Sequence, residues 1–391
     1  MLNQERRLRM RRAMEAKQLD ALILRLPENV LLLSGHWPMI GAAYLVFPRE
    51  GTSVCIVPEC YQAEVCSSLV DCEAIYYALG GAMDPPTAVA VKDLLAQQVK
   101  PGWRTIGYEG DFEMVAPSWN AAESLVPTAS YHRLLREACE GKTLVDVTRL
   151  MLEERVLKTP YEITRLAIAS EVSCFGLEAF EQAVGIGISG VQLAAQVEQA
   201  VMVRGTGYRE SVRVRAFAQV TTGHAETACA HRPNVISTMR PMGEGDIAVL
   251  ELGVVADGYW ADRTRVRLAG HARDEQIRIF ETVRKAQEAA VASIHPGVRA
   301  RDVDAAARAV IEDAGYGASF PHVTGHGLGF GYHEPAPILG PRSEDVLEEG
   351  MFTSVEPGIY TAVYGGVRIE DDVVVTKDGV LVLGPYKKVL S

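Results

Sequence analysis

Several features that would narrow the function are missing from this sequence. The seven cysteines are scattered and odd in number, without the close pairs that hold zinc or form a redox-active disulfide. No stretch approaches the ~18 consecutive apolar residues of a membrane-spanning helix. The charged N-terminus also lacks the apolar segment of a secretory signal. We therefore expect reduced thiols and a cytoplasmic protein with no membrane partner.

Positive charge is also scarce. The net charge is −11 at pH 7 and there is no long basic run, which argues against nucleic acid or an anionic membrane as the main partner. A small-molecule or dipeptide substrate is the better expectation. The 391 residues, 48% hydrophobic and 23% charged, suffice for about two or three globular domains at roughly 150 residues each.

The first part of the chain has an α/β pattern. We expect an opening helix, then strands in the apolar runs ALILRL, AAYLVF and SVCIVP, and further helices around residues 86–98 and 112–124. Thr159-Pro160 marks a boundary, because proline biases the preceding residue away from the helical conformation. The sequence therefore divides into two predicted domains, residues 1–158 and 159–391.

The second part contains an internal repeat. Residues 187–207 and 297–317 share three glycines at an offset of 110 positions, and both follow a helical pattern of apolar residues. The candidate helix caps are Ser189 and Asp302 at the start, and Gly205 and Gly315 at the end. Coincidence is the alternative, but a doubled half-domain explains the pattern more economically.

Histidines follow both copies of the repeat at the same spacing. A Gly-His pair, six residues and a His-x-Pro sequence occur at 223–233 and again at 325–335. The second copy, HVTGHGLGFGYHEP, has three of the nine histidines within twelve positions, and its glycines would let the backbone approach a bound metal closely. His224 is the repeat counterpart of His326, so it either reaches the same pocket or is a hydrogen-bonded structural residue.

Each copy is then followed by a strand pair that carries two acids. In DIAVLELGVVADGYWADRTRVRL, a hairpin turn at Ala256-Asp257-Gly258 would set Glu251 opposite Asp262 on one face. In the second copy, Glu356 and Glu370 flank a longer turn. A single such acid is usually a solvated strand position. Four mirrored carboxylates near histidines instead predict one or two divalent ions, with manganese, cobalt, iron or zinc as the suitable metals.

Four segments together resemble the pita-bread metallopeptidase superfamily, which includes prolidase, aminopeptidase P, methionine aminopeptidase and creatinase. They are HVTGHGLGFGYHEP, DIAVLELG with GYWADRTR, SVEPGIY and GGVRIEDD. The resemblance covers about residues 155–391. It implies an α/β (α+β) fold, with a small N-terminal α/β domain like that of creatinase and prolidase and a C-terminal pita-bread domain of two pseudo-symmetric halves.

The resemblance also implies roles for individual residues. The metal ligands would be Glu251, Asp262, His326, Glu356 and Glu370. The catalytic residues would be His231 and His333, which hydrogen-bond the substrate and the tetrahedral intermediate, and Glu356 as general base. The substrate-binding residues would be His322, Arg368 and, from a loop that reaches a neighbouring subunit in dimeric relatives, His36 and Trp37. The resemblance assigns no role to His224, which is a candidate for substrate binding from the internal repeat alone.

Two positions depart from the family pattern. Aspartate is usual where this chain has Glu251, and the longer side chain could weaken or relocate one ion. Ala230 precedes His231, where the peptidases commonly have proline and creatinase has a similar alanine. The number of bound ions and the substrate therefore stay open.

The leading hypothesis is a metal-dependent hydrolase of a C–N bond, an Xaa-Pro aminopeptidase or dipeptidase. In this mechanism Glu356 takes the proton of a metal-activated water and passes it to the leaving nitrogen. The alternative is a non-peptidase hydrolase of a small amide or amidine, like creatinase or ectoine hydrolase. A third hypothesis is a binding module without catalysis, which the retained ligand set disfavours. We expect manganese as the cofactor, with cobalt, iron or zinc as alternatives, and a homodimer.

Overall fold

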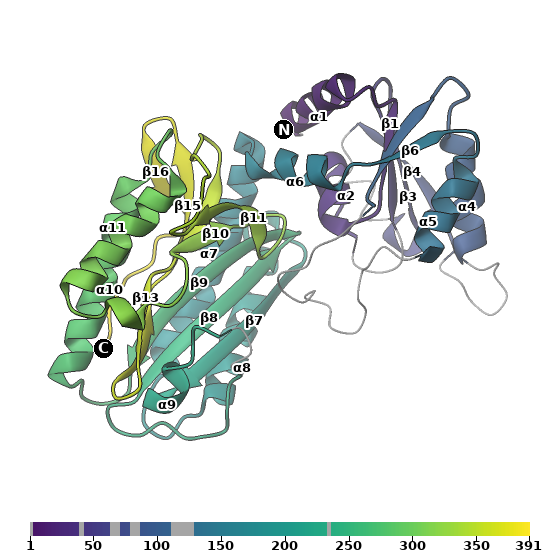
Figure 1. Cartoon of the computed structure of the whole chain (residues 1–391). Helices are drawn as coiled ribbons and strands as arrows, with labels where there is room; N and C mark the ends of the chain where they lie inside the picture. The colour runs from purple at the N-terminus through teal and green to yellow at the C-terminus, as the bar shows by residue number, and fades with distance from the viewer. Residues whose placement is uncertain (1–2, 39–42, 63–70, 79–86, 111–128, 233–235) are drawn as a thin grey trace. The chain divides into compact units, whose positions relative to one another are not determined.

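The computed structural model describes residues 3–38, 43–62, 71–78, 87–110, 129–232 and 236–391 (Figure 1). The chain divides into two compact units, Met1–Arg155 and Val156–Ser391. The helix predicted at residues 112–124 lies outside the described residues. Within the described ranges, no helix is long and apolar enough to cross a membrane, and the six cysteines are free thiols.

A six-stranded mixed sheet forms the centre of the N-terminal unit, in the order β4-β3-β2-β1-β5-β6. The strands are β1 (Ala21–Leu24), β2 (Tyr44–Pro48), β3 (Ser53–Pro58), β4 (Cys72–Tyr77), β5 (Thr105–Tyr108) and β6 (Thr143–Asp146). The helices are α1 (Gln4–Ala16), α2 (Pro27–Ser34), α4 (Thr87–Gln98), α5 (Ala129–Ala138) and α6 (Thr148–Val156). The three apolar runs predicted as strands form β1, β2 and β3, because their side chains are largely buried.

The C-terminal unit begins with two helices and a three-stranded sheet. The elements are α7 (Pro160–Ala183), α8 (Gly190–Gly205), β7 (Val214–Thr222), α9 (Gly223–Thr227), β8 (Ile247–Ala256) and β9 (Tyr259–Leu268). Helices α7 and α8 pack on the sheet β7-β8-β9 through a shared apolar core that includes Val172, Val197 and Leu250 (Figure 1).

The second half of this unit again begins with two helices. The elements are α10 (Asp274–Ser293), α11 (Ala300–Asp313), β10 (Gly325–Gly327), β11 (Glu334–Leu339), β12 (Phe352–Val355), β13 (Gly358–Thr361), β14 (Gly365–Arg368), β15 (Asp371–Thr376) and β16 (Gly379–Val382). A second apolar core joins α10 and α11 to these strands (Figure 1). The paired helices followed by strands in each half confirm the predicted pseudo-symmetry.

The helix ends show why the chain folds into these segments. Thr159 and Glu162 form a reciprocal capping box, and Pro160 occupies the first turn of α7. Ser189 caps α8 as predicted. The prediction for Asp302 is wrong, because the N-cap of α11 is Arg299 and Asp302 lies inside the first turn. At the C-terminal ends, Gly315 has the predicted left-handed conformation, whereas after α8 this role falls to Gly207 rather than Gly205.

The register of the β8–β9 hairpin differs from the prediction. Asp257 and Gly258, with φ values of 49° and 89°, form a two-residue turn between paired Ala256 and Tyr259. The pairing therefore sets Glu251 opposite Thr264, and Asp262 opposite Gly253. Glu251 and Asp262 still project from one face, because Asp262 is two residues from the partner of Glu251.

Candidate metal centre

Five acidic and histidine side chains predicted as metal ligands converge in the C-terminal unit. They come from β8, β9, β10, the residue after β12 and the residue between β14 and β15. Three groups can hold a metal, and within each group the ligand atoms lie within 4.8 Å of one another. The groups are Asp262 with His326 and His333, His326 with Glu356 and Glu370, and Glu251 with Asp262 and Glu370.

A break in the second hairpin places two of these acids. Val355 pairs with Asp371, and Gly358 pairs with Arg368 in the same register. Glu356 and Glu370 therefore face each other at the point where β12 and β13, and β14 and β15, are interrupted. The sequence prediction that these acids flank one hairpin is consistent with this arrangement.

Strand β10 carries His326 between two close neighbours. A side chain at Gly325 would lie 2.0 Å from the carbonyl oxygen of Ser354, and one at Gly327 would lie 2.0 Å from that of Ala336. The two glycines therefore allow the flanking segments to approach β10. This differs from the sequence interpretation, in which the glycines admitted a metal to the backbone.

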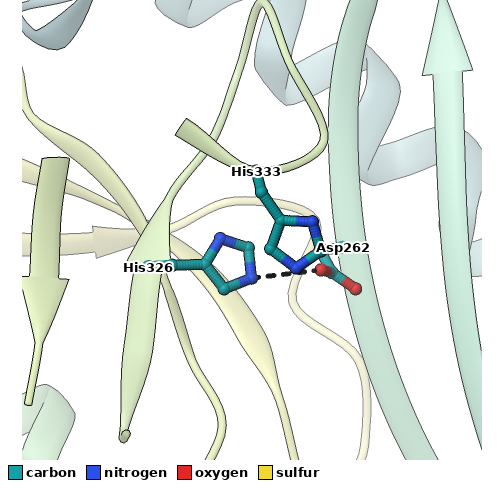
Figure 2. Close-up of side chains that lie close together, drawn as sticks. All are labelled: Asp262, His326 and His333. Atoms are coloured by element: carbon teal, nitrogen blue, oxygen red, sulfur yellow. Dashed lines mark ion pairs between the residues drawn. The ribbon is translucent and has the colours of Figure 1, made fainter. Parts of the chain in front are cut away.

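The imidazole of His326 directs an unprotonated nitrogen at the acids. Its Nδ1 lies 2.9 Å from the carbonyl oxygen of Gly327. Because a carbonyl only accepts hydrogen bonds, Nδ1 carries the hydrogen. Burial lowers the pKa of His326, so the ring is neutral and Nε2 presents a lone pair. Nε2 lies 3.5 Å from Oδ2 of Asp262 (Figure 2). It also lies 3.4 Å from Oε1 of Glu356.

Three lone-pair donors this close repel one another unless a proton or a metal cation lies among them. Glu370 adds a further acceptor and is fully buried. Its Oε2 accepts a 2.7 Å hydrogen bond from the Thr264 hydroxyl. Its Oε1 has no partner among the described side chains and backbone. A buried carboxylate oxygen without a partner is costly. The arrangement is therefore that of a cation site.

The electrostatics of the acids lead to the same conclusion. Burial raises the pKa of Asp262 well above its usual range, and the neighbouring carboxylates of Glu370 and Asp372 raise it further. Burial raises the pKa of Glu356 in the same way, with Glu370 and Asp262 adding to the effect. The acids can share one region in their charged forms only if an additional positive charge is present.

Sequence reasoning missed three hydroxyl groups that organise the site. Thr264 links Arg368 to Glu370, because it accepts from Nε of Arg368 at 2.9 Å and donates to Glu370. The hydroxyl of Tyr332 contacts Glu251 and Asp262 at 2.6 and 2.8 Å. The third is the hydroxyl of Tyr360, which contacts Arg368 and His322. Thr264 could have been found from the correct hairpin register, and Tyr360 lies within the quoted segment SVEPGIY.

Arg368, Tyr360 and His322 form a directional chain. Arg368 is buried and donates from Nη1 to the Tyr360 hydroxyl at 3.3 Å and to the carbonyl of Ala230 at 3.1 Å. Burial lowers the pKa of His322 to about 4, and its Nδ1 faces the carbonyl of Val323 at 2.8 Å. The Nε2 of His322 therefore accepts from Tyr360 at 3.0 Å. Arg368 also contacts Glu251.

The two predicted catalytic histidines border this centre. The ring of His333 lies 4.2 Å from that of His326, centre to centre (Figure 2). Burial lowers the pKa of His333 to about 3, and its Nδ1 has no hydrogen-bond partner within the described ranges. The ring of His231 lies 5.0 Å from that of Tyr360, and burial lowers its pKa. Both are neutral near pH 7.

One predicted substrate-binding residue of the C-terminal unit, His224, is not brought to these groups. His224 lies on α9 with an exposed side chain, and it belongs to none of the three metal-capable groups. His36 is buried in the N-terminal unit, where its ring contacts Tyr61 at 4.9 Å. Trp37 follows it in the same unit and is partly buried.

Comparisons with known proteins agree with this geometry. Residues 164–377 match metallopeptidase family M24, and residues 6–157 match the creatinase/prolidase N-terminal domain. The chain is 34% identical to an Xaa-Pro dipeptidase of Lactobacillus helveticus over 67% of this chain and 69% of the relative.

Solved structures are similar over nearly the full length. An Xaa-Pro dipeptidase from Bacillus anthracis is 27% identical with a TM-score of 0.80, and the match covers 99% of each chain. The prolidase of Pyrococcus horikoshii is 25% identical with a TM-score of 0.78, covering 99% of this chain and 100% of that chain. The expected fold, with a small α/β domain and a pita-bread domain, is confirmed.

Proposed function

The chain belongs to metallopeptidase family M24, and from this premise we propose that it is a metal-dependent Xaa-Pro dipeptidase. Relatives and solved structures that carry the name Xaa-Pro dipeptidase or prolidase support this substrate class. The observation that carries the proposal is the convergence of Asp262, His326, Glu356 and Glu370, whose lone pairs face one another in a buried site.

These four residues fit a divalent ion. His326 offers Nε2, and Glu370 offers a buried oxygen that has no other partner among the described groups. A divalent ion held there would polarise a substrate carbonyl and lower the pKa of a coordinated water. We propose manganese, because oxygen-rich ligand sets with one imidazole suit it.

Glu356 is proposed as the general base. Its Oε1 accepts a 3.1 Å hydrogen bond from the Ser354 hydroxyl, which fixes the carboxylate beside Nε2 of His326. A cation in the site favours the charged form of Glu356, which can then accept a proton at neutral pH. The same group would deliver that proton to the leaving nitrogen of proline.

The histidines and Arg368 are proposed to bind and orient the substrate. A neutral imidazole has one N–H group, so His231 and His333 can each donate one hydrogen bond to the reacting carbonyl. Arg368 holds Tyr360, Glu251 and Thr264 in place, and His322 fixes Tyr360 from the other side. That Arg368 lies near a substrate carboxylate and that His322 lines the substrate pocket stay predictions.

The test is hydrolysis of a substrate panel by purified protein after metal removal and after manganese addition. We expect cleavage of Xaa-Pro dipeptides that is lost with a chelator and restored by manganese. Slow cleavage of Xaa-Pro-Yaa tripeptides would distinguish a dipeptidase from an aminopeptidase. Creatine-like and ectoine-like compounds test the non-peptidase alternative. Cleavage of those compounds with no dipeptide cleavage would overturn the proposal.

Further proposals concern the whole chain. We propose the domains 1–158 and 159–391, which the division of the structure after Arg155 supports. A cytoplasmic location and a homodimer are proposed on the sequence grounds given above. His36 and Trp37 are proposed to act only in such a dimer, at the partner's site, which size-exclusion chromatography with light scattering would test.

A further inference from the structure

The hydroxyl of Tyr332 occupies the space between two predicted metal ligands. Its oxygen lies 2.6 Å from Oε1 of Glu251 and 2.8 Å from Oδ1 of Asp262. Tyr332 belongs to the loop between β10 and β11 and is buried. A phenol has one hydrogen, which here lies between two carboxylate oxygens, where a small cation would otherwise sit.

The ring of Tyr332 is held on several sides. It contacts Phe217 at 4.8 Å, Trp260 at 5.7 Å and His333 at 4.6 Å, measured between ring centres. Gly253 makes room for Phe217, because a side chain at that position would lie 2.2 Å from the Phe217 ring. These edge-to-face contacts fix the direction of the phenol and keep its hydroxyl between the acids.

Both carboxylate oxygens of Glu251 already contact a protein donor in this arrangement. Oε1 contacts Tyr332, and Oε2 contacts the guanidinium of Arg368. Arg368 is itself buried and fixed by Thr264 and Ala230. A carboxylate paired with a permanent cation attracts a metal ion less than an unpaired one.

The two sides of the centre therefore differ. Of the three groups that can hold a metal, one includes Glu251 with Asp262 and Glu370, and another includes His326 with Glu356 and Glu370. On the Glu251 side, Tyr332 and Arg368 already contact the carboxylate of Glu251. Glu370 belongs to both groups and has a buried oxygen with no partner in the described structure, and on the other side His326 adds a nitrogen lone pair.

We propose that this centre binds a single divalent ion through His326, Glu356, Glu370 and Asp262, and that Tyr332 with the Glu251–Arg368 pair takes the place of a second ion. The inference rests on the proposed metal dependence. It turns Glu251 from a ligand into the partner of Tyr332 and Arg368. An ion at the Glu251 side would need ligand bonds of about 2.0 to 2.2 Å, so it would have to displace the phenol.

The experiment measures manganese bound per chain in the full-length protein, by titration and by elemental analysis after dialysis. We expect one tightly bound ion in the wild type. Tyr332→Phe keeps the ring and removes the hydroxyl, and we expect a second ion to bind at least about tenfold more tightly than in the wild type. Spin coupling between two manganese ions should then appear in the electron paramagnetic resonance spectrum of this variant alone.

Two further variants serve as controls. Tyr316→Phe removes a hydroxyl that contacts Glu275 on α10, outside the three metal-capable groups, and should leave the stoichiometry at one. Glu251→Gln should retain the single ion, because Glu251 is not one of its ligands. Thermal unfolding of each variant shows whether it is folded.

The outcomes separate this inference from the proposed function. Two tightly bound ions in the wild type, loss of the ion in folded Glu251→Gln, or an unchanged second affinity in Tyr332→Phe would each overturn the single-ion inference. One bound ion without cleavage of any Xaa-Pro dipeptide would overturn the proposed function and leave the inference standing.

Discussion

Glu370 and Asp371 are neighbours in the chain but belong to two different buried acidic clusters. Asp371 is surrounded by cations: Arg263 lies 3.0 Å away, Arg265 2.6 Å and Lys388 2.9 Å, and Gln287 donates at 3.2 Å. Despite burial, the charges of Arg265 and Arg263 hold the pKa of Asp371 well below its usual range. This cluster is complete within the protein.

The cluster around Glu370 lacks such compensation. Asp262 and Glu356 have raised pKa values, because they are buried beside further carboxylates. Arg368 is the buried cation that contacts Glu251 and lies 3.8 Å from Glu356. A buried carboxylate that is paired with protein cations, like Asp371, has a structural role. Several buried carboxylates beside a neutral imidazole, with too few protein cations to balance them, indicate a site that binds a metal cation.

The largest expected effect is that of replacing Glu370, and it distinguishes the metal-binding role of Glu370 from the structural role of Asp371. Glu370→Gln removes the buried oxygen that faces the proposed ion. We expect metal content to fall and kcat/KM on an Xaa-Pro dipeptide to drop about 1,000-fold or more, because the ion contributes several kcal/mol of transition-state stabilisation. Without metal, the variant should be at least as stable as the wild type, since it removes a buried carboxylate oxygen that has no partner among the described groups. The matched control is Glu349→Gln at an exposed position. Retained metal in folded Glu370→Gln would contradict the assignment.

Asp371→Asn should have the opposite profile. It leaves Arg263 and Arg265 buried without their carboxylate, and breaking such a pair costs roughly 3 to 5 kcal/mol. Urea unfolding of the metal-free protein should therefore show a lower midpoint, while metal stoichiometry in the folded protein stays unchanged. If this variant does not accumulate, Lys388→Met removes the most exposed of the three cations and should give a smaller loss. An unchanged midpoint in both variants would break the comparison.

The sequence predicted which acids and histidines converge better than it predicted how they are held. The mirrored hairpins, together with the ligand set that the family resemblance implies, brought Asp262, His326, Glu356 and Glu370 into one predicted site, and the structure places them together. Periodicity identifies which face of a strand a residue occupies, but not its partner. The two-residue turn at Asp257-Gly258 makes Thr264, and not Asp262, the partner of Glu251. The role of Thr264 could therefore not be predicted from the expected register.

Other features could not be predicted because they depend on packing between distant segments. Tyr332 reaches Glu251 only because Phe217 and Trp260 hold its ring. The internal repeat suggested that His224 matches His326, yet α9 leaves His224 exposed. A repeated spacing therefore predicts the architecture of two halves, but it does not make equivalent positions share a function.

The two clusters should also respond oppositely to pH. Burial raises the pKa values of Asp262 and Glu356 above their ordinary values near 4, and it raises that of Asp372 to about 7. Between pH 4 and 7 these three acids bind more protons in the folded metal-free protein than in the unfolded chain, so their contribution to stability falls as pH rises, by up to about 1.4 kcal/mol per pH unit for each group. The four histidines with lowered pKa values, His231, His322, His326 and His333, bind fewer protons in the folded protein and offset part of this loss below about pH 6.5.

The contribution of Asp371 to stability has the opposite pH dependence. Its lowered pKa gives a stabilising contribution that is present above about pH 4 and is lost as pH falls further. Manganese favours the charged carboxylates and should abolish the contribution of the acids, so that with increasing pH between 4 and 7 the stability falls less, or rises more, than in the metal-free protein. Unfolding midpoints of the metal-free and manganese-loaded protein at pH 5, 6, 7 and 8 measure this. Identical slopes with and without metal would contradict the difference between the clusters.

The smallest expected effect concerns Asp372, which touches both clusters. Its carboxylate accepts from the backbone N–H of Asp262 at 3.2 Å and from the Ser170 hydroxyl at 3.0 Å, and the charge of Arg263 lowers its pKa against the effect of burial. Ser170→Ala removes a donor that favours the charged form. Below pH 7 this donor faces a mostly protonated carboxyl, and its loss should cost about 1 kcal/mol. Above pH 7 the acceptor is charged and the cost should rise to roughly 1.5 to 3 kcal/mol.

Ser173→Ala is the matched control on the same helix, because its hydroxyl donates at 2.7 Å to the carbonyl of Ser170, which does not titrate. Urea unfolding at pH 6 and 8 should show a pH-dependent loss in Ser170→Ala and a constant one in Ser173→Ala. An equal loss of roughly 1.5 to 3 kcal/mol at both pH values in Ser170→Ala would mean that Asp372 is already charged at pH 6 and belongs with Asp371 in the compensated cluster.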